Sequence, residues 1–241
     1  MTSTPAREAE RTRLSQATVI DRALALADAD GLDALTIRKL ATDLGVTPMA
    51  IYWHFHSKEE LLEGLAGQVW NEIDTPVDPA LDWPAQLRGL MESLVRVLRA
   101  HRSASQLLAS AEKMGSEAFL RVTETTLEVL RRAGFDPVRA SEVARNALHF
   151  GITLVMSAPG FDPVLAEADH AEIQRQHRVR LALLPPDRYP RLVEAAEPMT
   201  SCAPADEDFH YEFGIDLFLA GVKAAAQDTD TRAGSRGRTG R

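Results

Sequence analysis

Apolar residues recur three and four positions apart along most of this chain, which is the spacing that forms one face of an α-helix. One such set consists of Ile37, Leu40, Ala41 and Leu44. Proline or glycine separates one stretch of this kind from the next, and no stretch alternates apolar and polar residues over the length of a half-buried strand. The sequence therefore predicts an all-α protein.

Composition limits the compartment and the cofactors. The chain has 241 residues, 45% of them hydrophobic, which is enough for one large core or two smaller ones. Its single cysteine, Cys202, excludes a disulfide within the chain and a multi-cysteine zinc site, so we expect no metal or other cofactor. The first residues are polar, and no apolar run approaches the ~18 residues of a membrane span. We therefore expect a cytoplasmic protein with no membrane partner.

A tight turn separates two short predicted helices. Thr36 is a favoured N-cap residue for the first helix, and Gly45 is a typical C-terminal stop. Thr47 and Pro48 then supply a second capping side chain followed by proline at the first helical position. The pattern predicts two helices that are joined with almost no intervening loop.

The flanking helices complete a recognisable unit. An apolar stripe over residues 19–27 predicts a helix before the pair, and Ser57 with Glu60 forms a capping box for the helix after it. Two short helices under a preceding helix are the helix-turn-helix arrangement, which places the second short helix in the major groove. We predict a three-helix DNA-binding domain over residues 14–60, with double-stranded operator DNA as its partner.

Charge restricts how such a domain reads DNA. The net charge of −8 and the pI near 5.4 argue against a protein that coats nucleic acid without specificity. The second short helix contains no arginine or lysine, so apolar, hydroxyl and imidazole groups are expected to contact the bases. Arg38, near the start of the preceding helix, is expected to contact a guanine or a phosphate. Lys58 lies at a helix N-terminus, where backbone amides also attract phosphate.

This region resembles the DNA-binding domain of the TetR family of bacterial repressors. The resemblance is carried by LTIRKLATDLGVTPMAIYWHFHSKEELLEGLA. It implies that Thr36 and Lys58 contact phosphate and Arg38 a base. The residues implied to face the groove are Thr47, Pro48, Met49 and Ala50, and those implied to press on the DNA backbone or on the floor of the domain are Tyr52, Trp53 and His54. For Trp53 a core position is an equally good interpretation.

The rest of the folded chain, residues 61–226, is predicted to be a helical ligand-binding and dimerisation domain. It resembles more loosely the C-terminal domain of the tetracycline-repressor branch, through GFDPVRASEVARNALHFG and FHYEFGIDLFLAGVKA. The resemblance implies that these two helices of each subunit form a homodimer interface, in which we place Phe213 and Leu217. Leu108 stands where the branch has a magnesium-binding histidine, so a tetracycline–magnesium ligand is not expected.

The family resemblance also implies a repressor that binds a palindromic operator and is released by a small hydrophobic effector of unknown identity. Flexible aromatic and thioether side chains between helices are the candidates for its pocket, although helix packing explains each of them as well. These candidates are Met91, Phe119, His149, Phe150 and Met156. Residues 1–13 and the basic tail 227–241 contain too few apolar residues to fold and are predicted to be disordered.

Two other functions fit parts of the chain. Glu-x-x-His occurs at residues 167–170 and 207–210, a pattern that contributes to di-iron sites in helical bundles, but it leaves the N-terminal unit unexplained. A helical scaffold would bind protein with the exposed face of that unit, and a gel-shift assay distinguishes it from a DNA-binding protein. We therefore predict a regulator and not an enzyme, and the sequence leaves repression or activation open.

Overall fold

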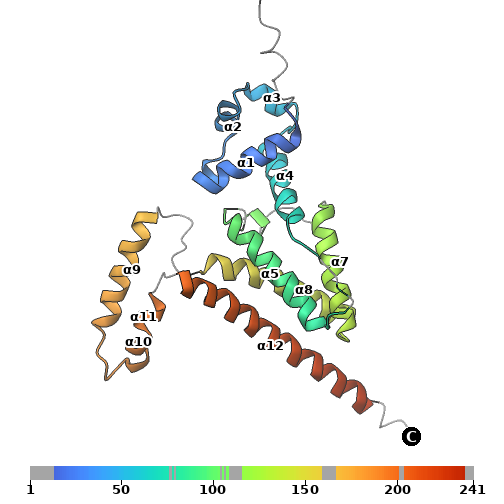
Figure 1. Cartoon of the computed structure of the whole chain (residues 1–241), viewed down its shortest axis with the longest axis vertical. Coiled ribbons are helices and arrows are strands. Elements are labelled where there is room, and N and C mark those ends of the chain that lie inside the picture. The colour runs from blue at the N-terminus through green and yellow to red at the C-terminus, as the bar shows by residue number, and fades with distance from the viewer. Residues whose placement is uncertain are drawn as a thin grey trace, which may run out of the picture.

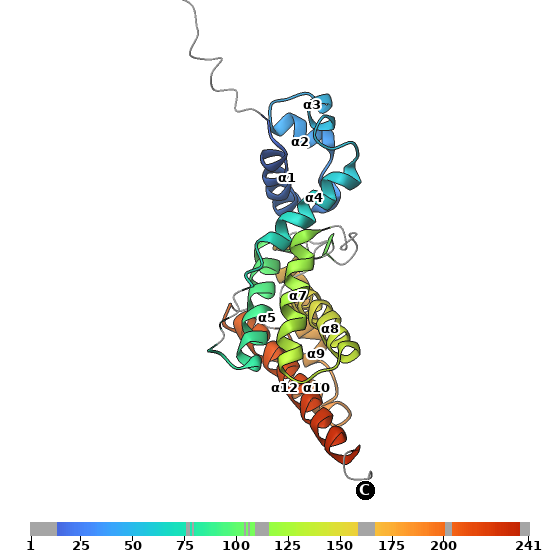
Figure 2. The same cartoon turned by 90° about the vertical axis from the view of Figure 1, so that its right-hand side faces the viewer.

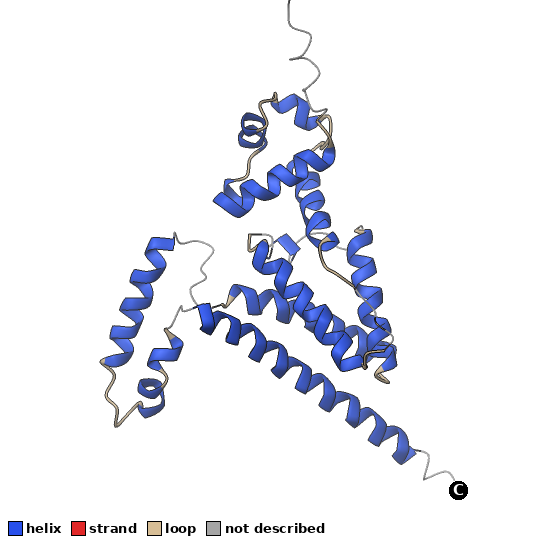
Figure 3. Ribbon diagram, in the orientation of Figure 1, coloured by secondary structure: helices blue, strands red, loops and turns tan. Residues whose placement is uncertain are grey.

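The computed structural model describes residues 14–75, 78, 80–103, 105, 107–108, 116–158, 167–200 and 204–236. All regular structure in these residues is helical (Figure 3), which confirms the all-α prediction for them. None of the described helices is long and apolar enough to cross a membrane. The predicted disordered arm, residues 1–13, lies outside the described residues.

One end of the elongated molecule is a small helical unit, the reading head (Figure 1). It comprises α1 (Gln16–Asp30), the short 3-10 helix η1 (Leu32–Ala34), α2 (Ile37–Asp43) and α3 (Pro48–Tyr52). Gly45 joins α2 to α3 with a φ of 66°, in the left-handed region that glycine adopts at little cost. The predicted tight turn is therefore present.

Side-chain caps define the beginning of each helix in the reading head. Ser15, Thr36 and Thr47 accept backbone N–H groups from the first turns of α1, α2 and α3. Ile51, with 0% exposure, anchors α3 in the core. A five-residue helix has little stability of its own, so capping and burial hold it in place.

Helix α4 (Lys58–Asn71) connects the reading head to the rest of the molecule (Figure 2). It packs on α1 at one end and on α7 at the other. Gly64 allows the first contact, because a Cβ atom there would lie 3.1 Å from Cδ1 of Ile20. The helix passes without a break through the domain boundary predicted at residues 60 and 61.

The body of the molecule is a layered helical bundle. Helices α5 (Trp83–Ala100), α7 (Glu117–Arg132) and α8 (Pro137–Met156) pack on one another, and α12 (Pro204–Arg236) lies along α5 and α8 (Figure 1). At Gly151 a Cβ atom would lie 2.7 Å from Cδ2 of Leu94, so a glycine permits this close approach of α8 to α5. The sequence predicted both long helices, at 137–157 and near 206–226.

One segment differs from the sequence-based prediction. Helix α12 continues to Arg236, so residues 227–236 are helical where a disordered tail was predicted. Extending an existing helix avoids the cost of nucleation, and this explains how a stretch of low apolar content can remain helical. Residues 237–241 lie outside the described part of the chain.

A separate helical arm projects from the body in Figure 1. It contains α9 (Glu167–Ala182), α10 (Pro190–Glu194) and α11 (Ala196–Met199), which contact one another. Arg178 of α9 donates to the backbone carbonyl of Thr200 at 3.2 Å and so links α9 to the end of α11.

Candidate functional site

The residues predicted to contact DNA lie together at the free end of the reading head. All ten are exposed or half-buried, and they form what we call the reading surface: Thr36, Arg38, Thr47, Pro48, Met49, Ala50, Tyr52, Trp53, His54 and Lys58. Met49 is 66% exposed and Trp53 is 81% exposed. Large apolar side chains gathered in this way on a small unit are typical of a binding surface.

The exposure of Trp53 decides between its two interpretations. A core tryptophan would be almost fully buried, as Trp70 is at 2%. Trp53 instead follows α3 as its C-cap residue and projects from the reading head. It is therefore free to contact a partner molecule.

The two threonine caps have a second hydrogen-bonding capacity. Thr36 Oγ1 accepts the N–H of Lys39 at 3.1 Å, and Thr47 Oγ1 accepts the N–H of Ala50 at 3.3 Å. Each hydroxyl still has its own hydrogen to donate. A phosphate or base oxygen at the reading surface is a suitable acceptor for it.

Ion pairs around the reading surface engage some charges and leave others available. Lys39 Nζ lies 2.8 Å from Asp30 Oδ2, and Arg22 of α1 binds the carboxylate of Asp43 at the end of α2. This hydrogen bond lowers the pKa of Asp43 below its usual value. Arg38 has no ion pair with any residue that the structure describes. It is thus the arginine of this surface that is available to an anion.

Two contacts hold the chain that follows α3, and sequence reasoning did not identify them. Gln16 Nε2 of α1 donates to the backbone carbonyl of His54 at 3.0 Å. Glu60 of α4 accepts the N–H of His56 at 2.6 Å; of the predicted capping box, the bond from the Glu60 N–H to Ser57 Oγ is present at 3.1 Å. The chain after α3 is therefore held from both α1 and α4.

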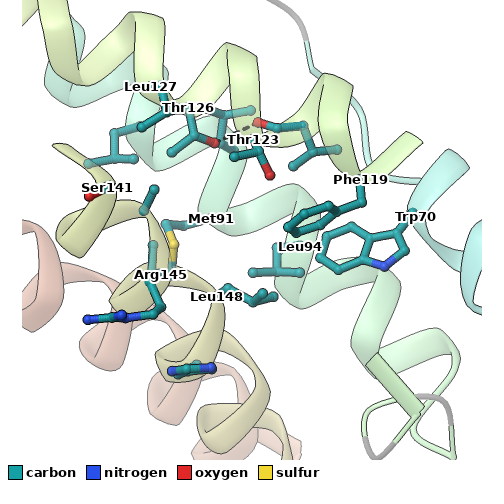
Figure 4. Close-up of a pocket in the computed structure, with 16 residues that line it drawn as sticks. Trp70, Met91, Leu94, Phe119, Thr123, Thr126, Leu127, Ser141, Arg145 and Leu148 are labelled. Atoms are coloured by element: carbon teal, nitrogen blue, oxygen red, sulfur yellow. Dashed lines mark hydrogen bonds between the residues drawn. The ribbon is translucent and has the colours of Figure 1, made fainter. Parts of the chain in front are cut away.

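A cavity of about 360 Å³ lies between α5, α7 and α8 (Figure 4). Its wall is mainly apolar: Trp70, Leu87, Leu90, Met91, Leu94, Phe119, Val122, Leu127, Ala144, Ala147 and Leu148. Its polar lining consists of Thr123 and Thr126 from α7 and Ser141, Arg145 and His149 from α8. A mostly apolar lining with few polar groups is typical of a small-molecule site.

The cavity includes some of the predicted effector residues and omits others. Met91, Phe119 and His149 line it. Phe150 does not, because its ring stacks on Phe218 of α12 with centroids 5.1 Å apart. Met156 is half-buried against the core and is also absent from the lining.

Trp70 connects the cavity to the reading head. It lies in the last turn of α4, and its ring meets the ring of Phe119 edge to face at 5.1 Å between centroids. Sequence reasoning did not identify it as a cavity residue. One wall of the cavity therefore belongs to the helix that begins at the reading surface.

A second exposed apolar surface follows α12. Phe209, Phe213 and Leu217 are 64%, 55% and 62% exposed and stand four residues apart, on one side of the helix. The first two rings stack with centroids 5.4 Å apart. The opposite side of α12 is buried in the body, for example at Ile215. This stripe includes both residues predicted for the dimer interface.

The groups considered for a di-iron site have other contacts. Glu207 pairs with Arg102, and His210 Nε2 lies 2.8 Å from the carbonyl oxygen of Leu154. The side chains of Glu167 and His170 lie outside the described residues. Among the residues described, no group of three or more histidine, cysteine or acidic side chains is arranged to hold a metal ion.

Comparison with known families agrees with this arrangement of reading head and cavity. The model of bacterial regulatory proteins of the tetR family matches residues 19–65, and that of the tetracyclin repressor-like C-terminal domain matches residues 75–226. The chain belongs to the TetR family. Members of this family are transcriptional regulators, and the two matches include most of the reading head and every cavity-lining residue except Trp70 of this TetR-family protein.

Individual relatives support the same assignment. The tetracycline repressor class G of Vibrio anguillarum is 30% identical over 68% of this chain and 79% of its own length. The crystal structure of the TetR-family protein ActR from Streptomyces coelicolor in complex with actinorhodin is 26% identical, with a TM-score of 0.75 over 89% of this chain and 97% of that one. In this TetR-family protein Leu108, which stands at the expected position of the branch's magnesium-binding histidine, is fully buried and apolar.

Proposed function

We propose that this chain is a homodimeric TetR-family repressor that binds an inverted-repeat operator and releases it when a small, largely apolar molecule fills the cavity between α5, α7 and α8. The observation that carries the proposal is the position of Trp70, which lines the cavity and belongs to the helix that extends from the reading head. The protein acts by binding and not by catalysis, and it works in the cytoplasm, where a bacterial operator is accessible.

In the proposed complex α3 enters the major groove, and Thr47, Pro48, Met49 and Ala50 face it. Met49 and Ala50 contact the apolar edges of bases such as the thymine methyl group, and Arg38 reads a guanine or binds a phosphate. Thr36 and Lys58 contact phosphates, and Tyr52, Trp53 and His54 lie against the sugar-phosphate backbone. The capped and anchored α3 is already in place before DNA arrives.

The proposed effector has an apolar body and a polar edge. The apolar body of the ligand fits against Met91, Leu94 and Phe119, where removing apolar surface from water favours binding. The polar edge faces α8, where Arg145 and His149 offer hydrogen-bond donors. The related ActR binds actinorhodin, which supports a ligand of this general kind.

Release requires that the effector prefer one conformation of the protein. To change an operator from almost fully bound to almost fully free, the preference must reach about 5.5 kcal/mol. We propose that the ligand displaces the Trp70–Phe119 contact, so that α4 moves and changes the spacing of the two reading heads in the dimer. Ligand and DNA then weaken each other's binding to the same degree.

The dimer is proposed to form through the exposed stripe of α12 together with α8. Phe213→Glu places a charge in this apolar surface, and it should shift the protein to monomers in light scattering. Glu212→Ala, on an exposed position beside it, is the matched control and should stay dimeric. A dimer that persists in Phe213→Glu and in Leu217→Glu contradicts this interface and leaves the DNA-binding proposal intact.

Footprinting of the purified protein on genomic fragments tests the proposed function. The expected footprint has two-fold symmetry, with half-site centres ~34–36 Å or a multiple of this distance apart. Footprints without symmetry, or no protection at any site, contradict the proposal. The protected sequences would also identify the regulated genes.

A further inference from the structure

His101 joins three helices at the boundary between the reading head and the body. It is the C-cap residue of α5, and its side chain is only 17% exposed. Its Nδ1 atom lies 2.7 Å from Oδ2 of Asp28 in α1, and its Nε2 atom lies 2.9 Å from Oε2 of Glu72 at the end of α4. Ser103 adds a third link, donating to Oδ1 of Asp28 at 2.8 Å.

The hydrogen-bond chemistry of this group requires a charged ring. A neutral imidazole has one N–H donor and one acceptor nitrogen, whereas both neighbours here are carboxylates, which accept. Only the imidazolium donates to both. The C-terminus of α5 also favours a positive charge at this position. Burial lowers the pKa of His101, but the hydrogen bonds that the ring donates to Asp28 and Glu72 outweigh it and raise the pKa above its usual value.

The group around His101 lies on two of the helices that line the cavity. Glu72 follows Trp70 by two residues on α4, and α5 reaches His101 after supplying Met91 and Leu94 to the cavity wall. Asp28 belongs to α1 of the reading head. Two of the helices that border the cavity, α4 and α5, therefore meet α1, the helix that supports the end of α3, at one imidazole ring.

We propose that the His101 imidazolium is a positioning residue that holds the reading head in its operator-binding orientation, so that loss of its proton weakens operator binding. The proposal rests on the proposed function, because it assumes that the reading head binds an operator. A head held in place loses less conformational freedom when it binds DNA, and this favours the complex. Deprotonation removes one of the two carboxylate contacts and frees the head.

The charges around the ring determine the direction of the pH effect. Asp28 faces the ring from α1 and Glu72 from α4; Arg96 of α5 contacts the backbone carbonyl of Glu72 at 3.4 Å and the carboxylate of Asp74 at 2.7 Å. A raised pKa means that the contribution is complete below the ordinary histidine value of about 6.5 and is lost as the pH rises through the higher value in the folded protein. Operator affinity should therefore fall as the pH rises through the folded-state pKa of His101, which lies above the ordinary histidine value.

The test compares operator affinity from pH 5.5 to pH 9 for the parent, His101→Gln and His101→Arg. Glutamine has a donor for one carboxylate only, so His101→Gln should bind about five- to tenfold more weakly at low pH and show a flatter pH profile. Arginine stays charged and donates to both carboxylates, so His101→Arg should keep the low-pH affinity across the range. His177→Gln, at an exposed site of α9, is the control and should follow the parent.

His54 and His56 are present in both the parent and His101→Arg, so a comparison of the two proteins isolates the contribution of His101. An NMR titration of the free protein gives the His101 pKa without any operator and should place it above about 6.5. A value at or below that, or a parent and His101→Arg with the same pH profile, overturns the proposal. A parent that binds no operator at any pH instead contradicts the proposed function.

Discussion

The reading surface and the cavity use the same kinds of side chain in opposite ways. The reading surface exposes Met49 and Trp53, whereas the cavity buries Met91 and Trp70 in its wall. The exposed pair contributes little to folding, because its contacts form when a partner arrives. The buried pair belongs to the core and to the ligand site at once. A substitution in the reading surface should therefore change binding alone, and one in the cavity should change stability and regulation together.

The largest effect separates the two tryptophans. Trp70→Ala should lower the free energy of unfolding by about 3–5 kcal/mol, the usual cost of replacing a buried aromatic side chain by alanine. Trp53→Ala should change it by less than about 0.5 kcal/mol, because the ring is exposed. Chemical denaturation of both variants at the same protein concentration measures the difference. Equal losses of unfolding free energy in the two variants would contradict the distinction between the reading surface and the cavity.

Substitutions in the reading surface should change operator affinity and leave the free energy of unfolding nearly unchanged. Arg38→Ala should cost about 1–3 kcal/mol of binding and relax the preference at one base position. Lys58→Ala is the matched comparison: it should weaken all sequences alike and reduce the salt dependence of binding. Fluorescence anisotropy with single-base operator variants at two salt concentrations measures both. If each variant binds as the parent does, the assignment of the reading surface is wrong.

The smallest effect tests how closely the cavity wall is packed. Gly151→Ala places a methyl group against Leu94, which must shift toward the cavity. The gain in helix propensity offsets part of the strain, so the free energy of unfolding should change by about 1 kcal/mol or less. The affinity for a cavity ligand should fall more than the stability does. Gly67→Ala, where a methyl group meets nothing within 4 Å, is the control.

The sequence predicted the reading head well because its determinants are local. Thr36, Gly45 and Thr47 act within one helical turn, and the residues they position belong to one short stretch of chain. The cavity depends on residues far apart in the sequence. Met91 and Phe119 were identified by chemical type, but Trp70 could not be distinguished from ordinary core before the packing of α4 on α7 was known.

Other features of the site that sequence patterns did not show have the same physical cause. Phe150 has the right chemical type for a pocket, yet α12 packs over it and its ring stacks on Phe218. The bond between Gln16 and the His54 carbonyl, like the group around His101, joins residues separated by many positions. No local pattern marks such contacts, because each partner alone is an ordinary polar surface residue.

The central claim is that a ligand bound in the cavity causes release of the operator. The most direct measurement titrates hydrophobic metabolites into the protein–operator complex, following operator release by anisotropy and ligand binding by the thermal unfolding midpoint. Thr123→Phe, which narrows the cavity, is the control. The account predicts that a compound that raises the midpoint of the parent also releases the operator, and that both effects diminish in Thr123→Phe. Compounds that stabilise the parent through this cavity but leave operator affinity unchanged would contradict it.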